Sequence, residues 1–170
     1  MKNTLKIIAA IACLYSSHLY AETIIEMHPT SNSGASLGKI VAHDTEHGLL
    51  LTPSLSGVPS GLHGFHLHTK TDCAEKGKAA GGHFDPQKTG KHLGPYNKGG
   101  HLGDLPALYS DSDGKVTLPV LAPRLHEADL KGHAIIIHAG GDNYSDSPKK
   151  LGGGGPRFAC GIVKLQIVSQ

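Results

Sequence analysis

Six histidines and one aspartate in this chain stand at spacings that suit a site for two metal ions. They are His66, His68, His83, His92, His101, Asp104 and His138. Imidazole suits copper and zinc, and mixed nitrogen and carboxylate ligands suit zinc. Seven candidate ligands exceed what one tetrahedral ion needs, so their number favours two ions. We therefore expect metal chemistry to decide the function.

The first group of candidates lies on two predicted strands. His66 and His68 alternate with apolar residues in the segment 64–68. Successive side chains of a strand point to opposite faces, so both imidazoles should point outward at one metal while the apolar pair enters the core. His138 ends the apolar run 134–137 and completes a nitrogen-rich site if its strand lies beside the first. Taken alone, two histidines at this spacing are usually solvated.

The second group of candidates lies in a glycine-rich stretch. Glycine stands one or two places before each of His83, His92 and His101, and Asp104 follows. Glycine allows the backbone to fold closely around an ion. Three histidines and one aspartate with no vacancy describe a closed, structural zinc site. Solvated loop histidines are the alternative, which the repeated glycine pattern and Asp104 disfavour.

The elements that must position these ligands are short strands. The chain of 170 residues is long enough for one domain with a real core, and its 23 Gly and 10 Pro indicate many turns. Alternating runs predict eight strands, which suits an antiparallel sandwich or barrel. These are Thr23–Met27, Lys39–Thr45, Gly48–Leu55, Gly61–His68, Ala107–Asp111, Lys115–Leu121, His133–His138 and Cys160–Ser169. Two long segments, 69–106 and 139–158, interrupt the pattern, and such loops are usually functional.

The first 21 residues have the pattern of a secretory signal. Lys2 and Lys6 form the basic start, the apolar stretch 7–14 follows, and Ala21 is the small residue at the expected cleavage point. The apolar stretch is too short to span a bilayer, so we expect no membrane insertion. Residues 22–170 would then form a single domain. Cys13 could instead be a lipoprotein cysteine, which the very short apolar stretch before it disfavours.

Cleavage of this signal changes the charge and the cysteine count. The chain has 16 Lys and Arg against 14 Asp and Glu, and the signal contains two Lys and no acid, which leaves 14 against 14. A mature chain of zero formal charge has no global field to attract nucleic acid or an anionic membrane. Cys73 and Cys160 remain, and an oxidising compartment favours one disulfide between them. Two free buried thiols are the alternative.

Four motifs in this order resemble those of the copper/zinc superoxide dismutase family, and specifically its bacterial exported branch. They are the segments 61–68, 81–86, 100–106 and 152–161, and the resemblance covers nearly all of residues 34–167. The family fold is an eight-stranded Greek-key barrel or sandwich, which agrees with the independent strand count. The resemblance also implies a location in the periplasm.

The resemblance implies a full set of site residues. Copper would be held by His66, His68, His83 and His138, and zinc by His83, His92, His101 and Asp104. His83 would be a shared imidazolate, which explains how seven residues fill eight ligand positions. Asp142 matches the aspartate that links a copper histidine to a zinc histidine, although it could equally be a turn acid beside Asn143. Cys73 and Cys160 match the family disulfide.

The activity that the resemblance implies is dismutation of superoxide to oxygen and hydrogen peroxide. Copper would alternate between Cu(II) and Cu(I), His83 would take up and supply a proton, and Arg157 would guide superoxide. A non-enzymatic exported copper- or zinc-binding protein is the alternative, which the cation of Arg157 disfavours. A zinc hydrolase would need an open zinc position. A homodimer is compatible with the sequence. The surplus histidines match no ligand position, and most should be solvated; they are His28, His43, His47, His63, His126 and His133.

Overall fold

The computed structural model describes residues 22–31 and 34–164, and nearly all of its regular structure is β-strand. The expected signal sequence, with Cys13, lies outside the described residues. The strands are β1 (Thr23–Pro29), β2 (Gly38–Thr45), β3 (Gly48–Leu55), β4 (Gly61–His63), β5 (Phe65–His68), β6 (Leu108–Ser110), β7 (Val120–Ala122), β8 (Ala134–His138) and β9 (Arg157–Ile162). Short 3-10 turns are η1 (Lys78–Ala80), η2 (Glu127–Leu130) and η3 (Leu151–Gly153).

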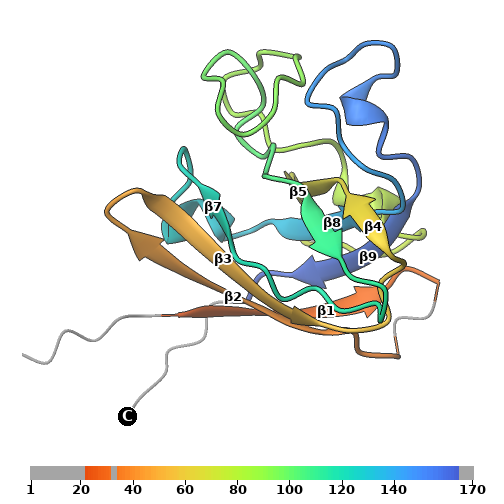
Figure 1. Cartoon of the computed structure of the whole chain (residues 1–170). Helices are drawn as coiled ribbons and strands as arrows, with labels where there is room; N and C mark the ends of the chain where they lie inside the picture. Colours follow the sequence, from red (N-terminus) through yellow and green to blue (C-terminus); the bar gives the residue numbers. More distant parts are fainter. Residues whose placement is uncertain (1–21, 32–33, 165–170) are drawn as a thin grey trace, which may run out of the picture.

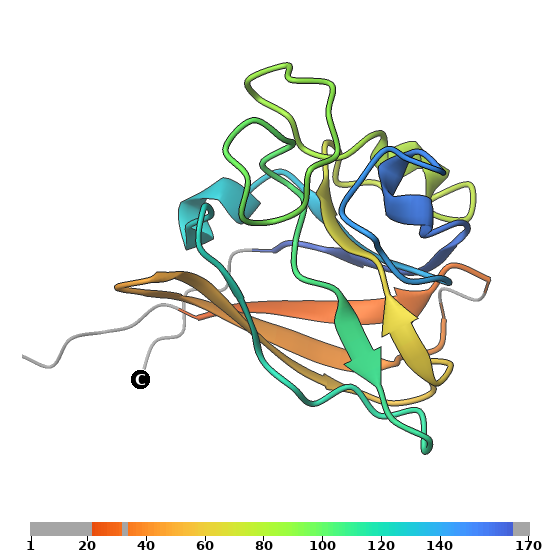
Figure 2. The same cartoon turned by 45° about the horizontal axis from the view of Figure 1, so that its top comes forward.

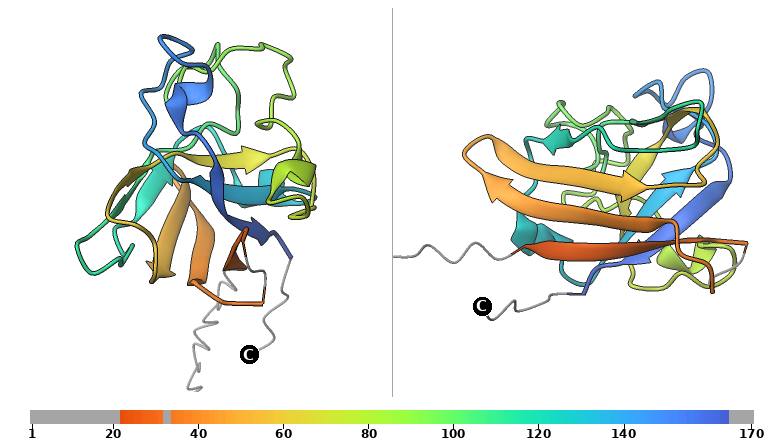
Figure 3. Two further views of the ribbon diagram at one scale, coloured as in Figure 1. Left: turned by 90° about the vertical axis from the view of Figure 1, so that its right-hand side faces the viewer. Right: turned by 60° about the horizontal axis from the view of Figure 1, so that its bottom comes forward.

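The strands form one large curled sheet and one small sheet. The large sheet has seven strands in the order β5-β8-β9-β1-β2-β3-β7, and the small one pairs β4 with β6. Neighbouring strands are antiparallel throughout. Figure 1 and both views of Figure 3 show the large sheet curving around the core. The expected all-β, antiparallel barrel or sandwich is confirmed.

Several strand boundaries differ from the expected ones. The segment expected as one strand over 61–68 is two strands, β4 and β5, because Gly64 leaves the ladder between them. Its amide donates to the carbonyl of Gly140 at 2.7 Å, and its own carbonyl accepts from the amide of His138 at 2.8 Å. The strand expected over 115–121 is regular only from Val120, since Pro119 has no amide to donate to a ladder. The last strand begins at Arg157, three residues earlier than expected.

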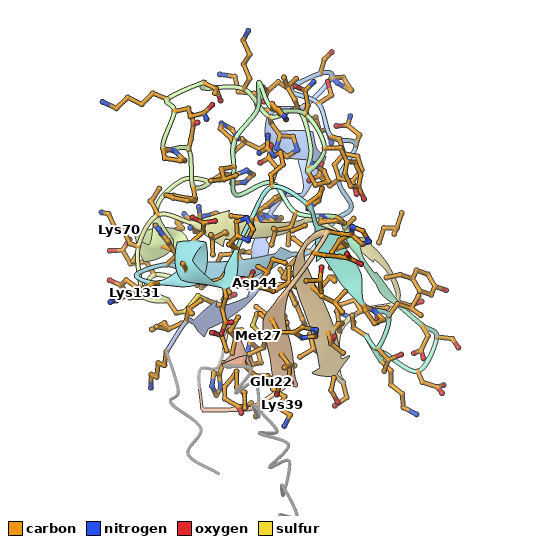
Figure 4. The ribbon with its side chains drawn as sticks, turned by 90° about the vertical axis from the view of Figure 1, so that its left-hand side faces the viewer. Glu22, Met27, Lys39, Asp44, Lys70 and Lys131 are labelled. Atoms are coloured by element: carbon orange, nitrogen blue, oxygen red, sulfur yellow. A yellow bond between two sulfur atoms is a disulfide. The ribbon has the colours of Figure 1, made fainter. Side chains whose placement is uncertain are left out.

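The core lies on the concave face of the large sheet. Alternate residues in the middle of β1 and β2 enter it, and Ile25, Met27 and Ile40 are fully buried. Strand β9 packs closely here: a Cβ on Gly161 would lie 2.4 Å from the sulfur of Met27, so only glycine fits. In Figure 4, Glu22, Met27 and Lys39 lie at the end of the molecule opposite the long loops.

The two long loops rise on the same side of the sheet and touch each other. They are coloured green and blue in Figures 1 and 2. The amide of His92 donates to the carboxylate of Asp146 at 2.9 Å, and the amide of Ala107 donates to the hydroxyl of Tyr144 at 2.9 Å. The Tyr144 side chain also lies so close to Gly94 that a Cβ on this glycine would be 2.7 Å from the Cβ of Tyr144. The loops therefore form one connected layer above the sheet.

A disulfide between Cys73 and Cys160 ties the first long loop to β9, as expected from the sequence. Cys160 is buried in a small apolar cluster with Ala80, Ala134 and Ile136. The two cysteines are 87 residues apart, so the bond closes a large part of the chain into one loop. Closing such a loop restricts the unfolded chain more than the folded one.

We expect Cys73→Ser to lower the free energy of unfolding by about 2–5 kcal/mol, because the unfolded chain regains the entropy of an open loop. Urea unfolding of the metal-free protein measures the difference. The parent protein treated with reductant is the matched control and should lose a similar amount. Two alkylatable thiols in the unreduced parent protein, or equal unfolding midpoints, would contradict the prediction.

Candidate metal centre

Strands β5 and β8 bring the first three candidate ligands together. They pair antiparallel, with His66 opposite Ile136 and His68 opposite Ala134, and His138 ends β8. As expected, Phe65 and Leu67 join the main core, and the two histidines that alternate with them lie on the other face. That face is not open to solvent: His66 and His68 are fully buried, and His138 is 7% exposed. The long loops cover them.

Four imidazole rings converge in a first cluster. His66, His68, His83 and His138 each offer a donor atom, and these atoms lie within 4.8 Å of one another. In each ring one nitrogen has a protein partner. Nδ1 of His68 donates to the carbonyl of Gly81 at 2.9 Å, and Nδ1 of His138 donates to the carbonyl of Gly155 at 3.0 Å. The nitrogens that remain are Nδ1 of His66 and Nε2 of His68, His83 and His138.

These four remaining nitrogens are buried and have no hydrogen-bond partner. A buried polar atom without a partner costs roughly 1–3 kcal/mol, and such atoms are rare in folded proteins. Four of them facing one another satisfy the requirement of a nitrogen-rich metal site, because the lone pairs can all bind one cation. Imidazole ligands that donate their other N–H to a fixed carbonyl are typical of metal sites.

A second cluster surrounds one oxygen of Asp104. Its Oδ1 lies 2.9 Å from Nδ1 of His83, 3.0 Å from Nδ1 of His92 and 3.3 Å from Nδ1 of His101. Bonds of about 2.0 Å to a tetrahedral zinc would separate ligand atoms by about 3.3 Å. Nδ1 of His92 lies close to Asp104 but is not oriented for a hydrogen bond with it. This nitrogen therefore has no hydrogen-bond partner. The donor set therefore fits a tetrahedral cation.

The two clusters share the ring of His83. Its Nδ1 faces Asp104, and its Nε2 is one of the unpartnered nitrogens of the first cluster. The ring stacks on that of His66 with centroids 3.9 Å apart. For this reason a donor atom of His66 also lies within 4.8 Å of those of His83, His92 and Asp104. Asp104 is already surrounded by Nδ1 of three other histidines, so we assign His66 to the first cluster.

Asp142 connects the two clusters by contacting one ring nitrogen of a histidine in each. Its side chain is fully buried, with Oδ2 2.7 Å from Nε2 of His66 and Oδ1 2.8 Å from Nε2 of His92. Oδ1 also accepts the amide of Tyr144 at 2.7 Å, so Asp142 is a turn acid as well as a link. Gly152 leaves room for it: a Cβ there would lie 1.9 Å from Oδ1, and its φ of +71° also favours glycine.

Burial sets the charge of the first cluster. It lowers the pKa of His66 to about 3, that of His68 to about 2 and that of His138 to about 4. These rings are therefore neutral near pH 7, with lone pairs free for a metal. Burial opposes the charge of His92 too, but the nearby carboxylates of Asp104 and Asp142 outweigh it and raise its pKa to about 9. Binding of a cation at His92 would release a proton.

Arg157 lies beside the first cluster. It pairs with His138 across β8 and β9, where a bulge shifts the register. Its guanidinium donates to the carbonyls of Gly77 and Gly81, each at 2.5 Å. The Gly81 carbonyl also accepts from His68, so one oxygen joins the arginine to a candidate ligand. The half-buried guanidinium is thereby held near the cluster in one orientation.

The surplus histidines do not all lie in solvent. His47 and His126 are exposed, as expected, but His63 is 1% exposed, so the expectation of solvation is wrong for it. Its Nδ1 lies 2.7 Å from the carbonyl of His138, and its Nε2 lies 2.6 Å from the carbonyl of Pro59. The strand period gave a signal for this, because His63 shares its parity with two core residues. Its neighbour Leu62 is 58% exposed.

Another structural residue that the sequence did not single out is Arg124. It precedes η2, and its guanidinium donates to the carbonyls of Asn97, Gly100 and His101. It thereby holds the loop that carries one ligand of the second cluster. Its sequence context, with Pro123 before it and Leu125 after it, has no pattern that indicates such a role.

Fold and site together define a metalloprotein: an antiparallel β-barrel that buries two adjacent donor clusters under its loops. Residues 28–163 match the family model described as copper/zinc superoxide dismutase. The superoxide dismutase [Cu-Zn] 1 of Salmonella typhimurium is 49% identical over 176 aligned positions, covering 96% of this chain and 99% of the relative. The chain belongs to the copper/zinc superoxide dismutase family.

Solved structures support the same relationship. The Cu/Zn superoxide dismutase from Brucella abortus aligns with a TM-score of 0.80 and 41% identity, covering 84% of this chain and 99% of that one. The monomeric copper, zinc superoxide dismutase from Salmonella enterica, a solution structure, aligns with a TM-score of 0.73 and 48% identity. That alignment covers 85% of this chain and all of the relative. The two donor clusters fit copper and zinc, the metals in the names of these relatives.

We expect His83→Ala to reduce the content of both metals, because this ring contributes a nitrogen to each cluster. His66→Ala should reduce copper and leave zinc close to one ion per chain. Elemental analysis of purified, metal-loaded protein measures both. His47→Ala, at an exposed hairpin tip, is the matched control. Equal loss of both metals from the His66 and His83 variants would contradict the shared position of His83.

Proposed function

We propose that this chain is an enzyme that dismutes superoxide: two superoxide ions and two protons give one oxygen and one hydrogen peroxide. The observation that carries the proposal is the first cluster, with four unpartnered imidazole nitrogens facing one another beside a fixed arginine. Neutral nitrogen ligands suit a copper ion that changes its oxidation state. Arg157 supplies a positive charge for a small anionic substrate.

The donor clusters support the assignment of each ligand. Copper would be held by Nδ1 of His66 and by Nε2 of His68, His83 and His138. Zinc would be held by Nδ1 of His83, His92 and His101 and by the carboxylate of Asp104. Asp142 orients His66 and His92, because it fixes the nitrogen of each ring that does not face the metal. Partners of this kind hold the tautomer and the direction of a ligand.

A bound copper ion would supply the one-electron chemistry. His83 would take up a proton at Nε2 when this atom is released from copper, and Nε2 has no other protein partner. Its opposite nitrogen faces Asp104 at 2.9 Å, so the ring keeps its place when Nε2 gains or loses a proton. Transfer of this proton, together with a second proton from solvent, would convert the reduced dioxygen to hydrogen peroxide.

Arg157 attracts and orients the substrate. A guanidinium stays charged and offers several N–H donors to a small oxygen anion. Arg157 lines a cavity of about 420 Å³, together with Lys76 and Lys78. The net charge of the mature chain is zero, so attraction must come from such a local group of cations.

The alternatives fit the site less well. A copper or zinc carrier has no need of an arginine beside its metal, because this charge repels the cation. A zinc hydrolase needs a zinc with three protein ligands and an open position for water. The second cluster has four donor residues, and Asp104 lies among three imidazoles.

We also propose that residues 1–21 direct export to the periplasm and that residues 22–170 form one enzyme domain. Among the described residues, no helix has the length and apolar character needed to cross a membrane. A disulfide between Cys73 and Cys160 suits an oxidising compartment. The homodimer stays a prediction, and the relative from Salmonella enterica is described as monomeric.

Metal-loaded protein should remove superoxide catalytically, and Arg157→Ile should lower the rate by roughly one to two orders of magnitude, because attraction and orientation are lost. Decay of a superoxide pulse, followed at several salt concentrations, measures the rate. The remaining activity of the variant should depend less on salt, since exposed charges are screened. Copper content should stay the same.

Arg157→Lys is the matched control, because it keeps the charge and loses the forked donors. It should retain more activity than Arg157→Ile and keep the salt dependence. A metal-loaded parent protein that leaves superoxide decay unchanged would refute the enzyme. Full activity of a copper-replete Arg157→Ile variant would refute the role of the arginine alone.

Expression of the full chain in a bacterium that exports it should yield a mature protein that begins at Glu22. The signal pattern of the first residues is the reason. Intact-mass analysis of the periplasmic fraction, with and without reductant, measures the cleavage and the disulfide. A full-length mass in the cytoplasm would contradict export, and a lipid-modified Cys13 would contradict the position of the cleavage.

A further inference from the structure

His133 lies outside both donor clusters and contacts the backbone of His68, a member of the first cluster. It is half-buried and immediately precedes β8. Its Nδ1 lies 3.0 Å from the backbone carbonyl oxygen of His68. A carbonyl oxygen only accepts, so Nδ1 of His133 carries the hydrogen in this bond. The two residues are 65 positions apart, so the contact is a product of the fold.

The carbonyl of His68 lies where the strand ladder ends. His68 is the last residue of β5 and pairs with Ala134, the first residue of β8. Beyond it the chain turns away toward the first loop, and the amide of Thr69 donates to the carbonyl of Gly82 at 3.1 Å. The imidazole of His133 therefore supplies the hydrogen bond that a backbone amide would supply if the strand ladder continued. It holds the end of β5 against β8.

His133 also touches the segment that carries the shared ligand. Its ring packs on that of Phe84, with centroids 4.2 Å apart. Phe84 follows His83, and its backbone bonds on both sides: its amide donates to Leu67 and its carbonyl accepts from Gly103, each at 2.8 Å. His68 and His83 meet in an isolated bridge between these two segments. His133 thus contacts both segments of that bridge.

We propose that His133 is a positioning residue for the copper half of the site. Its N–H fixes the backbone of His68, and its ring fixes Phe84, so that Nε2 of His68 and Nε2 of His83 keep their mutual direction. The ring of His68 is already held by Gly81, and the bond from His133 holds the backbone on which that ring stands. The proposal rests on the copper ligands assigned above. The zinc half shares His83, whereas the bond from His133 to the backbone of His68 concerns the copper half alone.

The test compares two substitutions that separate the donor from the ring. His133→Phe keeps a ring for the contact with Phe84 and removes the N–H. His133→Asn keeps an N–H at nearly the position of Nδ1 and removes the ring. His47→Phe, at an exposed hairpin tip, is the control. Copper affinity is measured by competition with a chelator, zinc by elemental analysis, and copper geometry by the electron paramagnetic resonance spectrum of Cu(II).

We expect His133→Phe to weaken copper binding roughly tenfold, the lower end of the effect of residues that orient ligands, and to change the Cu(II) spectrum. Zinc content should stay at the parent value, and His133→Asn should restore most of the copper affinity and the parent spectrum. An unchanged spectrum and affinity in His133→Phe would overturn the proposal. So would equal loss of both metals from the Phe and Asn variants, which would indicate general packing.

These outcomes are distinct from failure of the proposed function. The spectrum and the affinity report the copper site whether or not superoxide is consumed. A parent protein that binds copper at His68 and leaves superoxide untouched would refute the enzyme and leave the role of His133 open to the same measurement. A parent protein whose copper spectrum is unaffected by His68→Ala would refute the ligand assignment, and the role of His133 with it.

Discussion

Burial of imidazole nitrogens that lack protein partners is the constraint on which this structure depends. Four such nitrogens face one another in the first cluster, each in a ring whose other nitrogen is bonded. Their desolvation opposes folding, since each unmet polar atom costs roughly 1–3 kcal/mol. A bound cation reverses the balance, because the same lone pairs become ligands. Metal binding and folding stability are therefore coupled in this chain.

The bonds on the other side of each ring come from different parts of the fold. Gly81 and Gly155 supply carbonyls from the first and second long loops, and Asp142 supplies a carboxylate to one ring of each cluster. A rotation of any of these rings would break such a bond. The barrel contributes rigidity by a different route: β5 and β8 place three histidines on one ladder, where the core fixes their backbones.

The carbonyl of Gly81 links the candidate metal site to the arginine that we propose attracts the substrate. It accepts from His68 and from Arg157, so a ligand and the proposed guide for superoxide share one oxygen. The disulfide holds the same region from the other end, because Cys73 begins this part of the loop and Cys160 lies three residues beyond Arg157. The position of the arginine thus depends on the loop, the strand and the covalent bond between them.

Residue types and the local spacing of apolar residues were sufficient to predict much of the candidate metal site. The alternation in 64–68 placed two imidazoles on the face opposite the core, and the glycine-spaced histidines with Asp104 indicated a second cluster. Both are short-range patterns, which a strand or a loop expresses without reference to the rest of the chain. The sequence motifs, through the family they resemble, also indicated the disulfide, which the structure contains.

Only the tertiary structure decided the contacts between segments that are distant in the sequence. The division of one expected strand at Gly64, the burial of His63 and the contact of His133 with His68 each depend on a partner far along the chain. Asp142 could be a turn acid or a link by sequence, and it is both, because Gly152 leaves room beside it. The local sequence pattern determines which face of a strand a side chain lies on. Only the assembled barrel with its paired loops determines which residues that side chain contacts.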